Sequence, residues 1–477
     1  MKHASVPAVI VGLIMSLGLA AVSFGAADPA DRDLASSAAP SCKGLYKKKS
    51  VPAKALQALV QAHARWVEHR SNPGARRAEL CQADLSGAAL AGANLERAQL
   101  EGAVFRRANL YEASLAQASL AGADLSKAVL EGSNISGADL RRARLTGVNL
   151  FRAIADEAAL FDAVLIGAKL RESTFERAQL EGADLTAADL TGGNFVDAYF
   201  YGATLRHAVL LETDLMGADL RRTVLTGANL YRANLQGTLM DSAQLDKTQL
   251  VEADMESAYL DEANLREANL REAILRGADL RYANLQGAGL QEADMEGANL
   301  EQASLIKANL QSAKLRMAIL YHTVLDDADF RDASLNRAVL IEASGLRTIF
   351  TNGDLSEIYA PKASLRQARL NGAKLEAANF VGADLRGANF TGADLTHANL
   401  QEANLQDAVL AGTDLSGAGL DGSDLHRADL SGAILLSVTG LTQAQLDTAC
   451  VDKQTRLPTD LNRPAPCATA KKKGRRS

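Results

Sequence analysis

The chain has 477 residues, of which 47% are hydrophobic, 23% charged and only 4% aromatic. This composition excludes a disordered polymer and indicates an aliphatic core. The charge is uneven, because residues 78–437 carry 50 acidic and 32 basic side chains, a net charge of −18, while both ends are basic. Direct binding of this region to nucleic acid phosphates is therefore disfavoured.

The first 27 residues have the order of a secretory signal peptide. Lys2 and His3 precede an apolar run from Val6 to Phe24, and small residues follow at 25–27. We expect cleavage after Ala27 and an exported protein, periplasmic or secreted. The alternative is an uncleaved anchor in the inner membrane with the chain facing outward, because the apolar run is near spanning length.

Residues 28–77 are expected to form an N-terminal region that contains a cap helix over about 53–70. Apolar residues recur there at helical spacing, Pro52 suits the helix start, and Asn72-Pro73-Gly74 stops it. Trp66 is the only tryptophan of the chain. We expect it to plug the first turn of the following repeat rather than to contact a ligand.

A strict period of five follows the N-terminal region. From Leu80 to Leu435 every fifth residue is Leu, Phe, Met or Ile at 69 of 72 positions, and the exceptions are Ala155, Gly345 and Ala360. Two positions earlier stands a small residue, usually alanine. Such a period forms no stripe on an α-helix and alternates between the two faces of a straight strand. It is satisfied when the backbone turns a corner once per unit, with the large and small residues inward and Asp, Asn and Gly in the turns.

Tandem units such as Ala123-Asp124-Leu125 resemble the pentapeptide repeat family, and the resemblance covers residues 78–437. It implies an all-β fold, a right-handed quadrilateral β-helix with four pentapeptides per coil. Seventy-two units give about 18 coils and a rod about 85 Å long, with short α-helical caps at both ends. Residues 20 apart then stack, which places Ala155 one coil from Phe175.

Residues 438–470 are expected to form the C-terminal cap. Thr442 can N-cap a short helix through Leu446, and this segment resembles the closure of other exported members of the family. Residues 471–477 form a basic tail that we expect to be solvated.

The four cysteines lie at the two ends of the chain, which favours structural disulfides in an exported protein. Sequence proximity favours the pairs Cys42–Cys81 and Cys450–Cys467. A metal site is the competing interpretation, but the spacings are not those of metal ligands. We expect each disulfide to staple one cap.

The sequence contains no phosphate-binding glycine loop, nucleophile elbow or metal-binding helix motif. We therefore expect no catalytic, cofactor-binding or metal-binding residues, no cofactor and no small-molecule substrate, and a protein that is not an enzyme. Arg266, Arg271, Arg276 and Arg281 would point out of four different sides, close to glutamates. This pattern indicates a solvated belt of ion pairs rather than a binding site.

Apolar side chains directly after the inward residue are the candidates for a partner surface, because contiguous exposed apolar patches often mark interfaces. One column consists of Tyr321, Ile341, Pro361 and Val381, and a second run consists of Leu211, Tyr231 and Val251, preceded by Phe151, Phe161, Ile166 and Tyr201. For the first column, the alternative is that the irregular stretch Ser344–Ala360 bulges and covers it. For the second group, an interface is slightly favoured.

The sequence favours a non-enzymatic, exported interaction or scaffold protein that binds a protein partner of unknown identity, and it is compatible with a homo-oligomer. The alternative is an acidic mimic of a DNA duplex that binds a topoisomerase or another DNA-binding protein, as the family resemblance suggests. The net charge of −18 favours the mimic. The signal peptide and the 32 interspersed basic residues disfavour it.

Overall fold

The computed structural model describes residues 42, 44, 46–69 and 74–464. The chain divides into two parts, Met1–Lys43 and Gly44–Ser477, and the second part contains the fold. The signal peptide predicted for residues 1–27, Cys467 and the basic tail at 471–477 lie outside the described residues.

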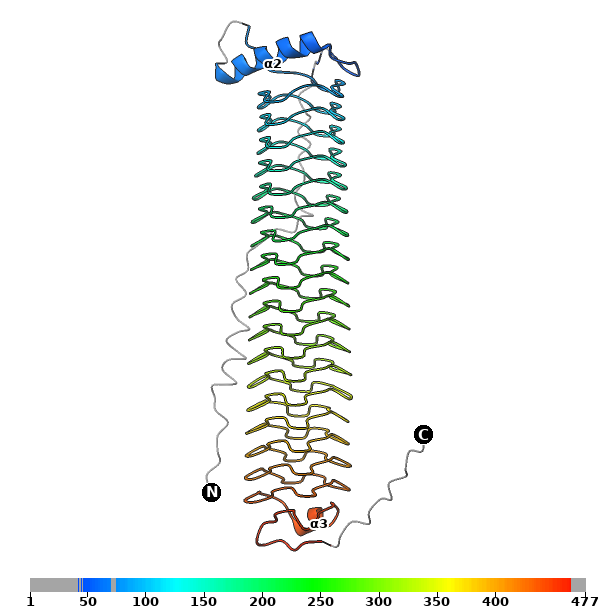
Figure 1. Cartoon of the computed structure of the whole chain (residues 1–477), viewed down its shortest axis with the longest axis vertical. Helices are drawn as coiled ribbons and strands as arrows, with labels where there is room; N and C mark the ends of the chain where they lie inside the picture. Colours follow the sequence, from blue (N-terminus) through cyan, green and yellow to red (C-terminus); the bar gives the residue numbers. More distant parts are fainter. Residues whose placement is uncertain (1–41, 43, 45, 70–73, 465–477) are drawn as a thin grey trace, which may run out of the picture. The chain divides into compact units, whose positions relative to one another are not determined.

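The second part consists mainly of stacked coils (Figure 1). Each pentapeptide contributes two turn residues, an inward small residue, one bridging residue and an inward large residue, so that every strand is a single bridge position. Bridge partners are parallel and 20 residues apart, from Glu79–Gln99 to Asp414–Ile434. Four pentapeptides therefore complete one coil, and the predicted right-handed β-helix is confirmed.

The inward leucines form the core. Leu285 is fully buried, and its N–H donates to the carbonyl of Ser304 in the next coil at 2.8 Å. At the corner the N–H of Ala288 donates back to the carbonyl of Leu285 at 3.0 Å. Because the same bonds recur in each unit, the buried backbone N–H and carbonyl groups are hydrogen-bonded at every corner.

The stacking of residues 20 apart explains one exception to the repeat. A bridge joins Ile154 to Thr174, which places Ala155 one coil from Phe175. Both residues are fully buried, and the ring of Phe175 stacks on Phe195 with their centroids 5.0 Å apart. A small inward residue thus lies beside a large one, as close packing of the core requires.

Helix α2, Ala53–Glu68, crosses the N-terminal end of the stack (Figure 1). Its buried residues are Leu56 and His63. Trp66 is half-buried and stacks on His63 with ring centroids 5.4 Å apart. The plug that the sequence assigned to Trp66 is therefore formed by Leu56 and His63, because they occupy the face of the helix that meets the first coil.

Helix α3, Gln443–Leu446, lies at the C-terminal end. Thr442 and Gln445 form a capping box at its N-terminus. The Gln445 amide nitrogen also donates to the carbonyls of Leu420 and Ser423, each at 2.9 Å. These bonds fix the helix to the last coil.

All three cysteines that the structure describes are in disulfides. Cys42 pairs with Cys81, as the sequence predicted. The partner expected for Cys450 is Cys467, which lies outside the described residues.

Candidate functional site

The β-helix has four sides, and each inward residue recurs on its own side 20 residues later. We name the sides after the inward residues of one coil, Leu320, Leu325, Phe330 and Leu335. On each side two residues per coil face outward, one before and one after the inward residue. A corner residue follows them, and its φ is positive in nearly every unit.

The nine residues predicted to form a partner surface lie on two opposite sides, and all nine are half-buried. The Leu320 side carries Phe161, Tyr201, Tyr321, Ile341 and Val381, and the Phe330 side carries Phe151, Leu211, Tyr231 and Val251. Positions ten residues apart are separated by two corners and therefore lie on opposite sides of the β-helix. The structure therefore does not bring Phe161 and Tyr201 together with the run at 211–251.

The Leu320 side contains an apolar surface that is larger than the predicted column. Bridges join Ile319 to Val339 and Val339 to Tyr359, and these three residues lie on the same side as the column at 321–381. We call the combined group the apolar patch: Ile319, Tyr321, Val339, Ile341, Tyr359, Pro361 and Val381. Sequence reasoning missed three members because it followed only the position after the inward residue. The period of 20 in the sequence was the signal that could have found them.

The stretch Ser344–Ala360 does not bulge over the patch. It forms a regular coil, with bridges from Ser344 to Ser364 and from Tyr359 to Asn379, so that alternative is wrong. Gly345 keeps the inward position because a Cβ there would lie 2.2 Å from the hydroxyl of Thr348. The Thr348 hydroxyl fills this space and donates to the carbonyl of Leu325 at 3.0 Å.

The second predicted run, on the Phe330 side, is more polar. The hydroxyl of Tyr231 donates to Glu252 at 3.2 Å. The guanidinium of Arg232 lies 4.8 Å from the Tyr231 ring centroid and pairs with Glu252 at 2.7 Å. Charged groups thus contact Tyr231, and Asn229 and Gln249 occupy two of the outward positions of this run. The run is therefore more polar than the apolar patch.

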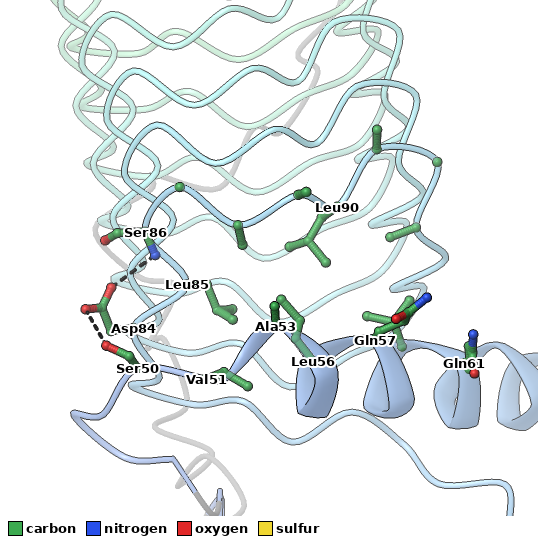
Figure 2. A pocket seen from close by; sticks show the side chains of 17 residues that line it. Ser50, Val51, Ala53, Leu56, Gln57, Gln61, Asp84, Leu85, Ser86 and Leu90 are labelled. Atoms are coloured by element: carbon green, nitrogen blue, oxygen red, sulfur yellow. Dashed lines mark hydrogen bonds between the residues drawn. The ribbon is translucent and has the colours of Figure 1, made fainter.

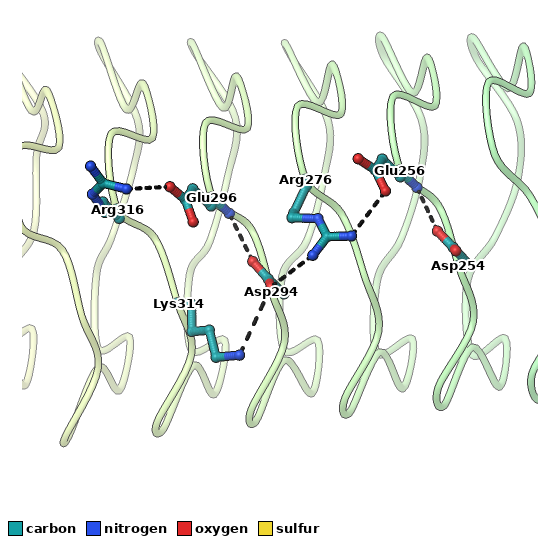
Figure 3. Close-up of polar contacts among 7 residues, drawn as sticks. All are labelled: Asp254, Glu256, Arg276, Asp294, Glu296, Lys314 and Arg316. Atoms are coloured by element: carbon teal, nitrogen blue, oxygen red, sulfur yellow. Dashed lines mark hydrogen bonds and ion pairs between the residues drawn. The ribbon is translucent and has the colours of Figure 1, made fainter.

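Ion pairs connect successive coils on the Leu335 side (Figure 3). Arg276 pairs with Glu256 at 3.0 Å and approaches Asp294 to 3.8 Å. In the following coil Lys314 lies 3.9 Å from Asp294, while Arg316 pairs with a neighbouring glutamate at 2.8 Å. The sign of the charge alternates from coil to coil, so these carboxylates are neutralised locally. Such exposed pairs contribute little to stability.

Two partly buried carboxyl groups lie one coil apart on the Leu320 side. Burial raises the pKa of both Asp241 and Asp261. Arg221 and Arg281 occupy the coils on either side, but each already pairs with an aspartate of its own coil, at 2.7 and 2.6 Å. Asp241 and Asp261 therefore bind a proton more readily than exposed aspartates, and they separate Tyr201 from the apolar patch.

The family model described as pentapeptide repeats matches residues 76–147, 158–256, 258–320, 323–358 and 363–435. These segments cover most of the chain. The chain belongs to the pentapeptide repeat family. No protein with a curated description matches this pentapeptide repeat protein.

Several solved structures are similar to this pentapeptide repeat protein. HetL of Nostoc sp. strain PCC 7120, a pentapeptide repeat protein involved in heterocyst differentiation regulation, is 39% identical, with 49% of this chain and 91% of HetL covered and a TM-score of 0.31. A pentapeptide repeat protein of the Arabidopsis thaliana thylakoid lumen is 27% identical, with 23% of this chain and 69% of that chain covered and a TM-score of 0.13. QnrB1, a plasmid-mediated fluoroquinolone resistance protein, is 16% identical, with 39% and 89% covered and a TM-score of 0.19.

No helix within the described ranges is long and apolar enough to cross a membrane.

Proposed function

We propose that this pentapeptide repeat protein is a non-enzymatic, exported interaction scaffold that binds a protein partner through the apolar patch. The proposal rests on the outward positions of the Leu320 side from Ile319 to Val381. Seven of these eight positions are apolar, the eighth is Asn379, and none is charged.

The backbone holds the patch in a fixed arrangement, because each of its coils is bonded to the coils before and after it. Its side chains therefore lose little conformational freedom when a partner packs against them. Tyr321 and Tyr359 suit the centre of such an interface, since tyrosine is common among residues that dominate binding. Burial of the apolar surface drives association without depending on charge.

Export is supported by two features near the N-terminus. Residues 1–27 have the charge, apolar core and small-residue order of a signal peptide. The disulfide between Cys42 and Cys81 suits an oxidising compartment outside the cytoplasm.

A duplex mimic is the second candidate, because residues 78–437 carry a net charge of −18. A DNA duplex presents one negative charge per about 1.7 Å without positive charges between them. On the Leu335 side, in contrast, Arg276, Lys314 and Arg316 alternate with the carboxylates (Figure 3). This alternation favours the scaffold over the mimic.

Photo-crosslinking in intact source cells tests the proposal. A photoreactive phenylalanine derivative replaces Tyr359 in the patch in one variant and Tyr231 on the opposite side in a matched variant. Both tyrosines are half-buried. We expect one protein to crosslink to the probe at 359 and not at 231. Equal crosslinking at both positions, or crosslinking at 231 alone, would exclude the patch as the partner surface.

A further inference from the structure

Each coil pairs with the preceding coil through hydrogen bonds that recur on every side. On the Phe330 side, the N–H of Asn109 donates to the carbonyl of Ala88 at 2.9 Å. The carbonyl of Asn109 accepts from the N–H of Leu90 at 2.7 Å, and the carbonyl of Tyr111 accepts from the N–H of Gly92 at 2.7 Å. One N–H and two carbonyls per side thus point toward the N-terminal end of the stack.

The C-terminal end of the stack is covered on all four sides, because the cap accepts a backbone hydrogen bond from each. The bonds, written as N–H donor to carbonyl, are Leu420 to Thr439, Arg427 to Thr448, Leu430 to Cys450 and Leu435 to Arg456. Their lengths lie between 2.7 and 2.8 Å.

The N-terminal end is covered less completely. On the Leu325 side, Asp84 donates to the carbonyl of Lys49 at 3.0 Å and accepts from the N–H of Val51 at 3.2 Å. On the Leu335 side, Nε2 of His63 lies 3.0 Å from the carbonyl of Glu96. These contacts use the segment before α2 and the helix itself.

On the Phe330 side of the first coil, no described residue provides such cover. The N–H and carbonyl of Ala89 and the carbonyl of Ala91 are the groups that point outward here, by analogy with Asn109 and Tyr111 one coil on. None of the three has a hydrogen-bond partner among the described residues, and both alanines are exposed. They form an open edge of a parallel sheet, a template for another strand.

A pocket of about 770 Å³ lies beside this edge, between helix α2 and the first coil (Figure 2). Leu56 and Val60 of the helix form one wall, and Leu85 and Leu90 of the coil form the other. Ala88, which also lines the pocket, is only half-buried, whereas the corresponding residues of the later coils are buried. The core is therefore incompletely covered beside Ala88, next to the backbone groups that have no hydrogen-bond partner among the described residues.

We propose that the Ala89–Ala91 edge and the adjoining pocket bind an extended peptide segment of a partner protein, which adds one parallel strand to the Phe330 side. The vacant groups set its register. A carbonyl of the peptide accepts from the N–H of Ala89, and the N–H two residues later donates to the carbonyl of Ala89. A third peptide N–H, two residues further on, donates to the carbonyl of Ala91.

This register also sets the side chains of the peptide. The first and third of its residues take the places that Ala88 and Leu90 hold one coil later, so both point inward. The bound segment therefore has a small residue, any residue and then a large aliphatic residue that enters the pocket. Main-chain bonds supply affinity and the pocket supplies selectivity, as in other strand-addition sites. This site is independent of the apolar patch.

The test uses the full-length protein and a synthetic peptide, GANLERA, which has the sequence of residues 92–98. Calorimetry measures binding, and hydrogen–deuterium exchange follows the amides of residues 86–93. The variant Ala89→Pro removes the vacant N–H. The matched control Ala91→Pro removes an N–H that makes no ladder bond, at a position where Pro361 occurs in this chain.

We expect the peptide to bind and to slow exchange at the edge. Ala89→Pro should weaken binding by about tenfold or more, and Ala91→Pro by less than about twofold. A peptide with aspartate in place of its leucine should not bind. Melting curves show whether each variant remains folded.

Three results would overturn the proposal. The first is no binding up to about 1 mM peptide, and the second is equal binding to both proline variants. The third is equal affinity for the peptide and for its derivative with aspartate in place of leucine. Sedimentation tests a different occupant. A dimer that dissociates on Ala89→Pro would assign the edge to a second copy of this chain and not to a peptide.

Discussion

Nδ1 of His63, on helix α2, accepts a hydrogen bond of 3.0 Å from the backbone N–H of Ala78, where the first coil begins. The ring therefore carries its proton on Nε2, which lies 3.0 Å from the carbonyl of Glu96. His63 thus joins the cap helix to the first coil through both nitrogens, and it does so only in its neutral form.

Acidification should weaken this contact, because burial lowers the pKa of His63 in the folded protein. A lowered folded pKa means that the stabilisation is complete above the unfolded value of about 6.5 and is lost as the pH falls below it. The fluorescence of Trp66, which stacks on His63, should report the change. A His63→Gln variant should lose this pH dependence, while His69→Gln should keep it. An unchanged fluorescence profile in His63→Gln would refute the assignment.

Truncation of a core leucine should destabilise the β-helix. Leu285 is fully buried, so Leu285→Ala should lower the free energy of unfolding by about 2–5 kcal/mol through cavity formation. The outward neighbour Gln286 offers a control, because Gln286→Ala should change it by less than about 0.5 kcal/mol. Denaturant melts measure both values. Equal effects of the two substitutions would contradict the inward position of residue 285.

Glycine should stabilise corners that now hold other residues. Ala187 has a φ of 56° and is exposed, and a side chain in this left-handed region costs about 1–2 kcal/mol. Ala187→Gly should therefore raise the free energy of unfolding by about 0.5–1 kcal/mol after the greater chain entropy of glycine is subtracted. Ala411→Gly, at the first turn residue of its unit, where φ is not positive, should lower it by a similar amount. The prediction fails if both substitutions shift the melting curve in the same direction.

The two disulfides should remain at opposite ends of the rod. Cys81 belongs to the first coil, and Cys450 pairs with Leu430 of the last. These coils are about 85 Å apart by strand spacing, whereas a disulfide needs Cα atoms within about 7 Å. Non-reducing peptide mapping should recover Cys42–Cys81 and Cys450–Cys467. A bond between the ends within one chain would be incompatible with the β-helix.

Much of the fold follows from the sequence, because one inward residue recurs every fifth position without a shift of phase. The repeat places even Gly345, which has no side chain to fill its inward position, inside a regular coil, although a bulge of the irregular stretch Ser344–Ala360 was the alternative suggestion. That suggestion was wrong because the space is filled by Thr348, from the next unit, and neighbouring contacts of this kind are not visible in the repeat pattern.

The surface was harder to predict, since it depends on which residues share a side. Ile319, Val339 and Tyr359 stand before the inward residue, and Tyr321, Ile341 and Val381 stand after one. Only the 20-residue coil unites them in one patch. The open edge at Ala89 was also missed, because the sequence predicted the cap helix but not which sides of the first coil it would cover.

Binding of the crosslinked partner at two salt concentrations distinguishes an apolar interface at the patch from binding by charge. The protein, the patch variant Tyr359→Ser and the opposite-side control Tyr231→Ser are compared at about 50 and 500 mM salt, where exposed charges are screened to different extents. We expect the affinity of the unmodified protein to change by less than about twofold with salt, since apolar burial is not screened. Tyr359→Ser should lower it by about tenfold or more, and Tyr231→Ser should leave it unchanged. If the affinity falls steeply with salt and is the same for the unmodified protein and Tyr359→Ser, the result would contradict the scaffold and favour the duplex mimic.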